Sequence, residues 1–451
     1  MATALYTSTL IQPPGNQHPV LLQRFDGQWR RASTWILLAL WIYYALNGIS
    51  PFVNEPTAMR AVSTNSGDSA AFERASKLVL FLVCMAFAVR RRQSVLRFAR
   101  QMKLITLFPL LALILSPISQ QATRTITSAL VLLGSILLMY SIAGAYTLDQ
   151  VLEQLLVLGA VTITGSIVFA LALPQYGLDN MGGHATAWKG VFSAKNALGD
   201  MALFFLTAAV SYRPRTTPMR ALRAWQILTC LVAIAFSQAA TAYMLTGVYI
   251  IYFAVMKSLH RFRKRDYVVL AAAMIITFLV AASAMVLFRP DFVLTLLGKD
   301  ATLTGRTQIW TAVLHSISQR PLFGYGYQAF WLGLEGESYH VILAVSWMLS
   351  QAQSGFLDVT VETGIGGLMI VLLVFFFAFR DALACLFRSR DEACLSAVEW
   401  YLAVVLLTML YNLDESFLFE PKHLGSMIFV LACAGLKQEW LRLQEGSLHA
   451  Y

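Results

Sequence analysis

The feature that most constrains this chain is a succession of apolar stretches, each about long enough to cross a lipid bilayer. A transmembrane helix needs roughly 17–25 mainly apolar residues. We predict such stretches at residues 34–53, 76–90, 104–118, 125–146, 150–173, 196–212, 222–238, 241–257, 267–288, 365–380, 396–412 and 424–436. The sequence therefore predicts an all-α, polytopic integral membrane protein with about twelve transmembrane helices.

The composition agrees with lipid as the solvent. Hydrophobic residues make up 58% of the chain and charged residues only 13%, whereas soluble domains average about 25% charged residues. The net charge of +10 comes from short basic clusters between apolar stretches, which is typical of membrane orientation rather than of nucleic-acid binding. The five cysteines show no metal-ligand spacing. We therefore expect the bilayer as a partner, and neither nucleic acid nor metal.

The basic clusters predict the orientation of the chain. They precede the first predicted span and follow the second, sixth, eighth and tenth spans, and the positive-inside rule places such clusters in the cytoplasm. This divides the chain into a cytoplasmic segment, nine helices, a long periplasmic loop, three helices and a cytoplasmic tail, at residues 1–33, 34–288, 289–364, 365–436 and 437–451.

The long loop at 289–364 is expected to be ordered, because loops of this length are usually functional or disordered and this one carries helical patterns. Apolar residues recur at helical spacing after Thr304 and Gly305, at Ile309, Trp310, Val313, Leu314 and Ile317. A second apolar helical stretch runs from Tyr339 to Gln351. We expect both to be helices lying on the membrane surface.

Cations at helix starts on the periplasmic side are the first candidates for function. Arg306 follows Gly305 at a predicted helix N-terminus, and Lys195 and Asn196 begin the sixth span, shortly after Lys189. Free backbone N–H groups and the helix dipole favour an anion at such positions. A phosphate-bearing lipid would suit them. The alternative is that these side chains are interfacial anchors.

Aromatic and acidic residues on the same side are the second group of candidates. Tyr325 and Tyr327 belong to a Gly- and aromatic-rich run that suits either sugar stacking or an interfacial belt. Asp358 and Glu362 lie four residues apart, on one face of a predicted helix beside the membrane. Further carboxylates on this side are interpreted as solvated charges near span ends: Glu335, Asp414, Glu415 and Glu420.

The order of these motifs resembles the O-antigen ligase/polymerase superfamily of bacterial envelope enzymes, and most of all its exopolysaccharide-polymerase branch. The likeness rests on four motifs: Gly190-Val191-Phe192 with Lys195-Asn196-Ala197-Leu198-Gly199; Thr304-Gly305-Arg306-Thr307 with Trp310; Gly324-Tyr325-Gly326-Tyr327-Gln328-Ala329-Phe330-Trp331; and Ser354-Gly355-Phe356-Leu357-Asp358 with Glu362, Gly364 and Gly367. The motifs span residues 190–370, and topology extends the likeness to the remainder.

The resemblance implies a fold and a reaction. Such enzymes are similar in fold to C-type membrane glycosyltransferases of the bacterial inner membrane. The donor is a glycan linked to undecaprenyl pyrophosphate, and a hydroxyl of an acceptor glycan attacks its anomeric carbon with inversion, without metal or cofactor. Arg306 matches the family's Thr-Gly-Arg arginine and Lys195 its Lys-Asn position; cations there would stabilise the departing pyrophosphate. Chain-length regulators and flippases are the further partners that this resemblance suggests.

One position departs from the family pattern. Where the family usually has His, this chain has Gln353, and a glutamine amide cannot accept a proton at neutral pH. Either the His is not obligatory, another group acts, or the chain is inactive. Glutamine can still orient a hydroxyl by hydrogen bonding, and Glu337, His340 and Asp358 are the candidate substitutes.

Three functions stay open at this point. A polymerase would join lipid-linked repeat units, whereas a ligase would move a glycan onto lipid A-core or another acceptor. A lipid-linked glycan transporter is the rival from a different class, and it should carry polar residues in mid-span. The spans show little of this beyond Ser237, Gln238 and Thr241 at a turn, which favours surface enzymology.

The orientation gives the first testable prediction. Both termini and residues 258–266 should be cytoplasmic, and residues 290–363 periplasmic, because of the Lys/Arg asymmetry. A membrane-impermeant thiol reagent added from outside should label a cysteine introduced at Gly336 but not one at Ser258. The reverse labelling pattern would overturn the argument for a periplasmic site.

Overall fold

The structure is a computed structural model that describes residues 36–37, 39–45, 67–179, 186–262, 306–345 and 348–448, and most of these residues are helical. Its elements are α3 (Gly67–Arg90), α4 (Arg92–Gln101), α5 (Lys103–Ile114), η1 (Ser116–Ile118), α6 (Ala122–Ala145), α7 (Leu148–Ala172), α8 (Pro174–Gly177), β1 (Leu178–Asp179), β2 (Ala187–Trp188), α9 (Lys195–Ser211), α10 (Thr217–Ser237), α11 (Ala240–Phe262), α14 (Arg306–Gln319), α15 (Ser338–Val345), α16 (Gly355–Arg388), α17 (Glu392–Tyr411) and α18 (Leu424–Leu448).

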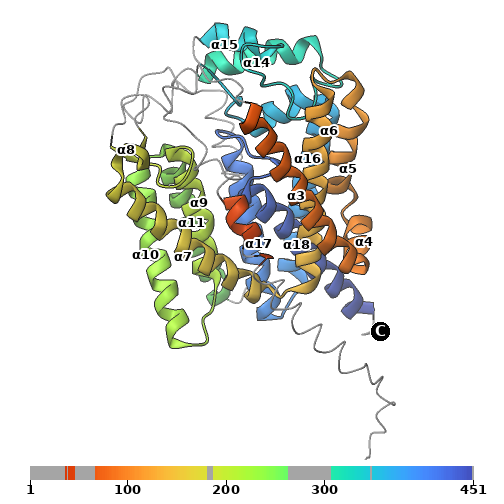
Figure 1. Cartoon of the computed structure of the whole chain (residues 1–451). Coiled ribbons are helices and arrows are strands. Elements are labelled where there is room, and N and C mark those ends of the chain that lie inside the picture. Colours follow the sequence, from red (N-terminus) through yellow and green to blue (C-terminus); the bar gives the residue numbers. More distant parts are fainter. Residues whose placement is uncertain are drawn as a thin grey trace, which may run out of the picture.

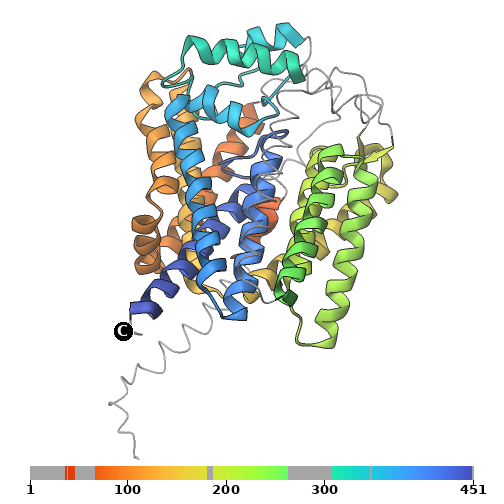
Figure 2. The same cartoon turned by 180° about the vertical axis from the view of Figure 1, so that it is seen from behind.

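The helices form two side-by-side groups with a cap over one end (Figure 1). In one group α9 packs against α7 and α10, and in the other α6 packs against α3, α5 and α18 while α16 packs against α17 and α18. Contacts of α17 with α9 and α11 join the groups. Helices α14 and α15 lie across the end of the second group, as Figure 2 shows from behind. This cap is the part of the molecule that carries the loop motifs.

The outer faces of the long helices are apolar, as a chain surrounded by lipid requires. Leu228 on α10, Ile251 on α11 and Phe376 on α16 are large hydrophobic side chains that are exposed in the isolated chain. A soluble monomer rarely exposes apolar surface on this scale. The protein is therefore a multi-pass membrane protein.

Six of the described helices are long and apolar enough to cross a membrane: α6, α7, α10, α11 (over residues 240–257), α16 and α17. Predicted spans 76–90, 104–118, 196–212 and 424–436 also fall on helices, but α5 and α9 are short and α3 and α18 carry more charged residues. The described part of span 34–53 is helical, and span 267–288 lies outside the described residues. The number of twelve spans stays a prediction.

The expected loop contains the helix that the apolar spacing predicts. Helix α14 begins at Arg306, with Ile309 and Val313 buried beneath it. The second stretch is helical only as α15, which ends at Val345 rather than at Gln351. A two-residue antiparallel pairing of β1 with β2 is a small departure from an all-α fold.

Helix α16 begins at Gly355, ten residues before the span predicted at 365–380, and it is kinked at Gly364. Gly364 has a φ of 69°, and a Cβ there would lie 2.2 Å from the carbonyl oxygen of Leu322. Near the kink the carbonyls of Val361 and Glu362 accept hydrogen bonds from the backbone N–H groups of Tyr325 (2.9 Å) and Gly326 (2.8 Å). The Gly-Tyr-Gly-Tyr motif therefore docks its backbone directly against α16.

The loop also shows where the labelling experiment is best performed. Gly336 has a φ of 64°, and a Cβ there would approach Gln120 Oε1 to 2.6 Å, so a cysteine at this position would be strained. Leu334 is 63% exposed and is the better position on the side predicted to be periplasmic. The Arg215 side chain, 89% exposed between α9 and α10, provides the matching position on the side predicted to be cytoplasmic.

The kink leads to a stability prediction. Gly364→Ala should lower the free energy of unfolding by about 2 kcal/mol, because a left-handed φ and a backbone clash both penalise the new Cβ. Gly366→Ala is the control, since its Cβ would meet nothing nearer than 3.8 Å, and it should change stability by less than about 1 kcal/mol. Unfolding curves of the purified variants in detergent measure both values. Equal stability of the two variants would show that the kink tolerates a side chain.

Candidate functional site

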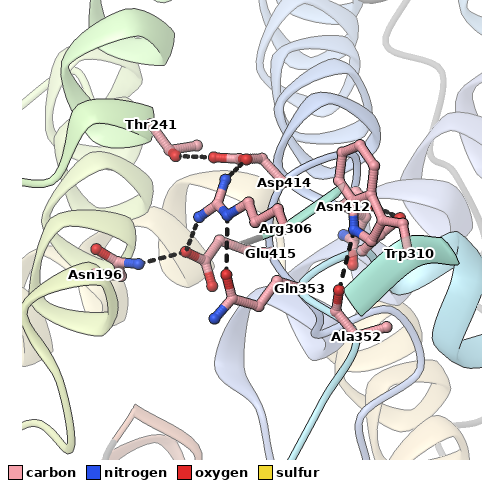
Figure 3. A network of polar contacts seen from close by, with 10 residues as sticks. Asn196, Thr241, Arg306, Trp310, Ala352, Gln353, Asn412, Asp414 and Glu415 are labelled. Atoms are coloured by element: carbon pink, nitrogen blue, oxygen red, sulfur yellow. Dashed lines mark hydrogen bonds and ion pairs between the residues drawn. The ribbon is translucent and has the colours of Figure 1, made fainter. Parts of the chain in front are cut away.

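The candidate site is built around Arg306, the first residue of α14. Its guanidinium donates from Nε to Gln353 Oε1 at 2.8 Å. The Nη1 nitrogen pairs with Asp414 Oδ1, and Nη2 lies 3.8 Å from Glu415 Oε1. All three nitrogens of the planar fork thus face an oxygen, as Figure 3 shows.

Two side chains from the other helix group complete this cluster. Asn196, at the start of α9, donates from Nδ2 to Glu415 Oε1, and Thr241, at the start of α11, donates from its hydroxyl to Asp414 Oδ2. The cluster therefore joins α9, α11, α14 and the loop between α17 and α18 at the capped end of the molecule (Figure 3). We call Arg306, Asp414, Glu415, Gln353, Asn196 and Thr241 the arginine cluster.

The loop that carries the two acids is fixed by the start of α16. The backbone N–H of Gly355 lies 2.9 Å from both the Asn412 and the Glu415 carbonyl oxygens. The Asn412 side chain accepts the Phe417 N–H at 3.0 Å and would lie 2.1 Å from a Cβ at position 355. Glycine at 355 therefore lets the loop approach the helix closely enough to place Asp414 and Glu415.

Gln353 is held in an unusual backbone conformation beside Arg306. Its φ of 53° is in the left-handed region, which costs a non-glycine residue about 1–3 kcal/mol and is most common at functional sites. Its neighbour Ala352 is anchored on both sides: Trp310 Nε1 donates to its carbonyl at 3.1 Å, and its N–H donates to Asp358 Oδ2 at 3.0 Å. These anchors direct the amide of Gln353 toward Arg306.

Burial makes the charges of the cluster depend on one another. The side chain of Arg306 is 14% exposed and that of Glu415 is 9% exposed. Burial raises the pKa of Glu415, while Arg306 and the Asn196 hydrogen bond oppose that rise. Burial also lowers the pKa of Arg306, and Glu415 opposes the shift. Because each ion's partner compensates for lost hydration, removing one strongly destabilises the other.

A second polar cluster lies in a small cavity of about 70 Å³ lined by Arg124, Gln328, Trp331, Asp358, Glu362 and Glu420, among others. Gln328 Nε2 donates to Glu420 Oε2 at 2.7 Å, and Trp331 Nε1 donates to Asp358 Oδ1 at 2.6 Å. Asp358 therefore supports the Ala352 backbone behind Gln353 rather than contacting Arg306. Burial raises the pKa of Glu420, with Lys422 as the strongest opposing charge.

Other residues proposed from the sequence lie away from Arg306. Glu337 accepts from the Ser316 hydroxyl at 3.4 Å, and His340 is exposed on α15. Tyr325 and Tyr327 are only 4% and 2% exposed. Their hydroxyls donate to the carbonyls of Ser316 at 3.0 Å and Phe419 at 2.6 Å. The two tyrosines therefore pack the loop and leave no ring face open for stacking on a sugar.

The two lysines lie at the start of the α9 motif. The backbone N–H of Lys189 donates to the Gly177 carbonyl at 2.9 Å, and the backbone N–H of Lys195 donates to Asp179 Oδ2 at 3.2 Å. Lys195 directly precedes Asn196, which contacts Glu415. The motif thus reaches the arginine cluster through Asn196, and a phosphate-binding role for the lysines stays a prediction.

Sequence reasoning treated Asp414 and Glu415 as solvated charges, and the structure corrects this. Both contact Arg306. The signal that could have found them is acidic residues gathered within one short loop, 412–423, between two strongly apolar helices. Thr241 was noted only as part of a polar turn, and it holds Asp414.

The ion pairs lead to a prediction about stability. Arg306→Ala leaves two largely buried carboxylates without their cation and should lower the free energy of unfolding by about 3 kcal/mol. Adding Glu415→Gln to Arg306→Ala should recover part of this loss, because it removes one of the unpaired charges. Arg215→Ala, at an exposed pair with Asp149, should cost less than about 1 kcal/mol. Thermal unfolding in detergent compares the variants, and additive losses in the double variant would contradict the coupling.

Comparisons with known proteins agree with this picture. A family model described as O-antigen ligase matches residues 225–372, a range that contains Thr241, Arg306 and Gln353. The chain is 27% identical over 278 residues to the exopolysaccharide production protein ExoQ of Rhizobium meliloti (strain 1021). This match covers 60% of the chain and 63% of that relative's length. These matches confirm the resemblance that the motifs show to the O-antigen ligase/polymerase superfamily and to its exopolysaccharide branch.

Proposed function

We propose that this chain is a membrane glycosyltransferase that polymerises oligosaccharide repeat units carried on undecaprenyl pyrophosphate. The observation that carries the proposal is the meeting of three distant motifs at one point: Arg306 contacts both Gln353 and Glu415, and Glu415 contacts Asn196. A buried arginine with a planar fork of donors suits the two phosphate groups of such a carrier. The relative's printed function, exopolysaccharide production, supports a polymer as the product.

The proposed reaction is an inverting displacement that uses no metal. A hydroxyl of the acceptor glycan attacks the anomeric carbon of the donor, and lipid pyrophosphate leaves. Arg306 would stabilise the charge that develops on the leaving group. Gln353, whose amide oxygen accepts from Arg306 Nε at 2.8 Å, would keep the guanidinium in the orientation that the pyrophosphate requires and position the acceptor hydroxyl.

The proposed setting is the bacterial inner membrane, with the capped end of the molecule in the periplasm. The donor and the growing glycan would then meet at the outer leaflet, in a C-type glycosyltransferase-like arrangement with about twelve spans. A flippase that delivers the donor and a chain-length regulator that limits the product are the proposed protein partners. The basic clusters at the opposite helix ends, such as Arg213, Arg215, Arg220 and Arg223, support this orientation.

A transporter is less well supported by the described helices. Buried charged residues inside them include Asp200 and Asp381, which are 4% exposed. Each lies within about two turns of a helix end, and Asp381 pairs with Lys437 at 3.4 Å. A transporter pathway instead concentrates polar groups near the bilayer midplane.

Purified protein in lipid, supplied with a synthetic undecaprenyl-pyrophosphate repeat unit, tests the proposal. A ladder of products supports polymerisation, and Arg306→Lys should abolish most of it while expression stays normal, because lysine lacks the planar fork. A single addition to a supplied core acceptor would instead identify a ligase. Absence of transfer, combined with movement of the intact donor across the bilayer, would support a transporter.

The role of Gln353 leads to a kinetic prediction. Gln353→Ala should slow turnover, because Nε of the Arg306 guanidinium loses its side-chain acceptor. Gln353→His should be tolerated or faster, with a new dependence on pH near the ordinary histidine pKa of about 6.5. Turnover rates of both variants, measured at several pH values, test the prediction. Wild-type rates and a normal ladder in Gln353→Ala would show that the side chain takes no part.

A further inference from the structure

The arginine cluster contains one positive charge and two negative charges. Arg306 faces Asp414 and Glu415, and its third nitrogen position, Nε, is taken by Gln353. A pyrophosphate approaching this arrangement would meet a guanidinium whose three nitrogens each already face an oxygen, and a net negative charge. If Arg306 binds pyrophosphate, as the proposed function requires, at least one carboxylate must first leave it.

Asp414 and Glu415 differ in how easily they can leave. Glu415 is the more buried, at 9% side-chain exposure, and its backbone carbonyl accepts from Gly355 N–H at 2.9 Å. The Asp414 side chain is 29% exposed and is held from the far side by the Thr241 hydroxyl. A substrate can therefore reach Asp414, and Thr241 gives its carboxylate a second anchor after it parts from Arg306.

We propose that the donor's pyrophosphate displaces Asp414 from Arg306, and that the released Asp414 carboxylate is the catalytic base for the acceptor hydroxyl. This inference rests on the proposed function and deepens it. It also supplies the proton acceptor that Gln353 cannot be. The same exchange couples the two substrates, because the base becomes free only when the donor is in place.

The acceptor oxygen forms a bond to the anomeric carbon of the donor, while the bond between that carbon and the pyrophosphate oxygen breaks. The bonding electron pair leaves with lipid pyrophosphate, whose charge Arg306 stabilises. The acceptor's proton passes to Asp414, which returns it to water before its carboxylate pairs with Arg306 again. A base of this kind typically contributes about 10²–10⁴-fold to the rate.

The surroundings of Asp414 favour the exchange. Among the residues that the structure describes, Arg306 from α14 and Glu415 from the same loop are the charged groups at Asp414, and Asp200 of α9 interacts electrostatically with Glu415. Loss of a cationic partner increases the affinity of a carboxylate for a proton. Replacing Arg306 as neighbour with a phosphate group therefore makes Asp414 a better base at the moment the donor binds.

Binding and turnover should change in opposite directions in Asp414→Asn. We expect this variant to bind undecaprenyl pyrophosphate in nanodiscs at least about threefold more tightly than the wild type, because the competing carboxylate is gone. Its turnover should fall by about 10²–10⁴-fold, and the loss of rate at acidic pH expected for the wild type should disappear. Asp414→Glu should restore part of the turnover. Glu335→Gln, at an exposed acid between α14 and α15, should match the wild type in both measurements.

Thr241→Val provides a second variant in case Asp414→Asn does not fold. It removes the hydroxyl that anchors Asp414, so turnover should fall while undecaprenyl pyrophosphate binds as tightly as to the wild type or more tightly. Weaker pyrophosphate binding in either variant would overturn the exchange and assign Asp414 a structural role. Unchanged turnover in Asp414→Asn would overturn its role as base. Tighter binding in a protein whose wild type transfers no glycan would instead refute the proposed function and leave the exchange standing.

Discussion

A buried arginine must be neutralised by the protein or by a ligand, and this requirement determines how the capped end of the molecule is built. Arg306 is 14% exposed, and desolvation of an unpaired guanidinium would cost several kcal/mol. The chain meets the requirement with Asp414 and Glu415, from a loop far away in the sequence, and the two acids are in turn held by Thr241 and Asn196. The ion pairs of Arg306, with the hydrogen bonds that hold its two acids, thus connect α14 to both helix groups.

Backbone contacts with α16 position the acidic loop and the aromatic motif. Gly355 allows the 412–415 segment to lie against the start of α16, and Gly364 allows the 321–326 segment to lie against its kink. The same helix therefore fixes both the acidic loop and the aromatic motif. Gln353 lies between α15 and α16 in a left-handed conformation, and its side chain accepts a hydrogen bond from Arg306.

The sequence predicted the membrane class and the helix that begins at Arg306, because apolar length and helical spacing are local properties. It did not predict the partners of Arg306, since acids gathered in loop 412–423 do not indicate which distant cation they pair with. It also placed Tyr325 and Tyr327 at a surface, whereas their hydroxyls find carbonyl acceptors inside the protein. The span predicted at 365–380 did not include the first turns of α16, because these turns carry Asp358 and Glu362, which lower the apolar content of the segment.

In the proposed exchange, Arg306 releases an internal carboxylate and binds the phosphate of its substrate instead. An experimental structure of the protein in lipid, with undecaprenyl pyrophosphate bound, tests this most directly. We expect a phosphate oxygen on Arg306 Nη1, with Asp414 turned away and still hydrogen-bonded to Thr241. An intact pair between Arg306 and Asp414, with the pyrophosphate bound to other residues, would contradict it.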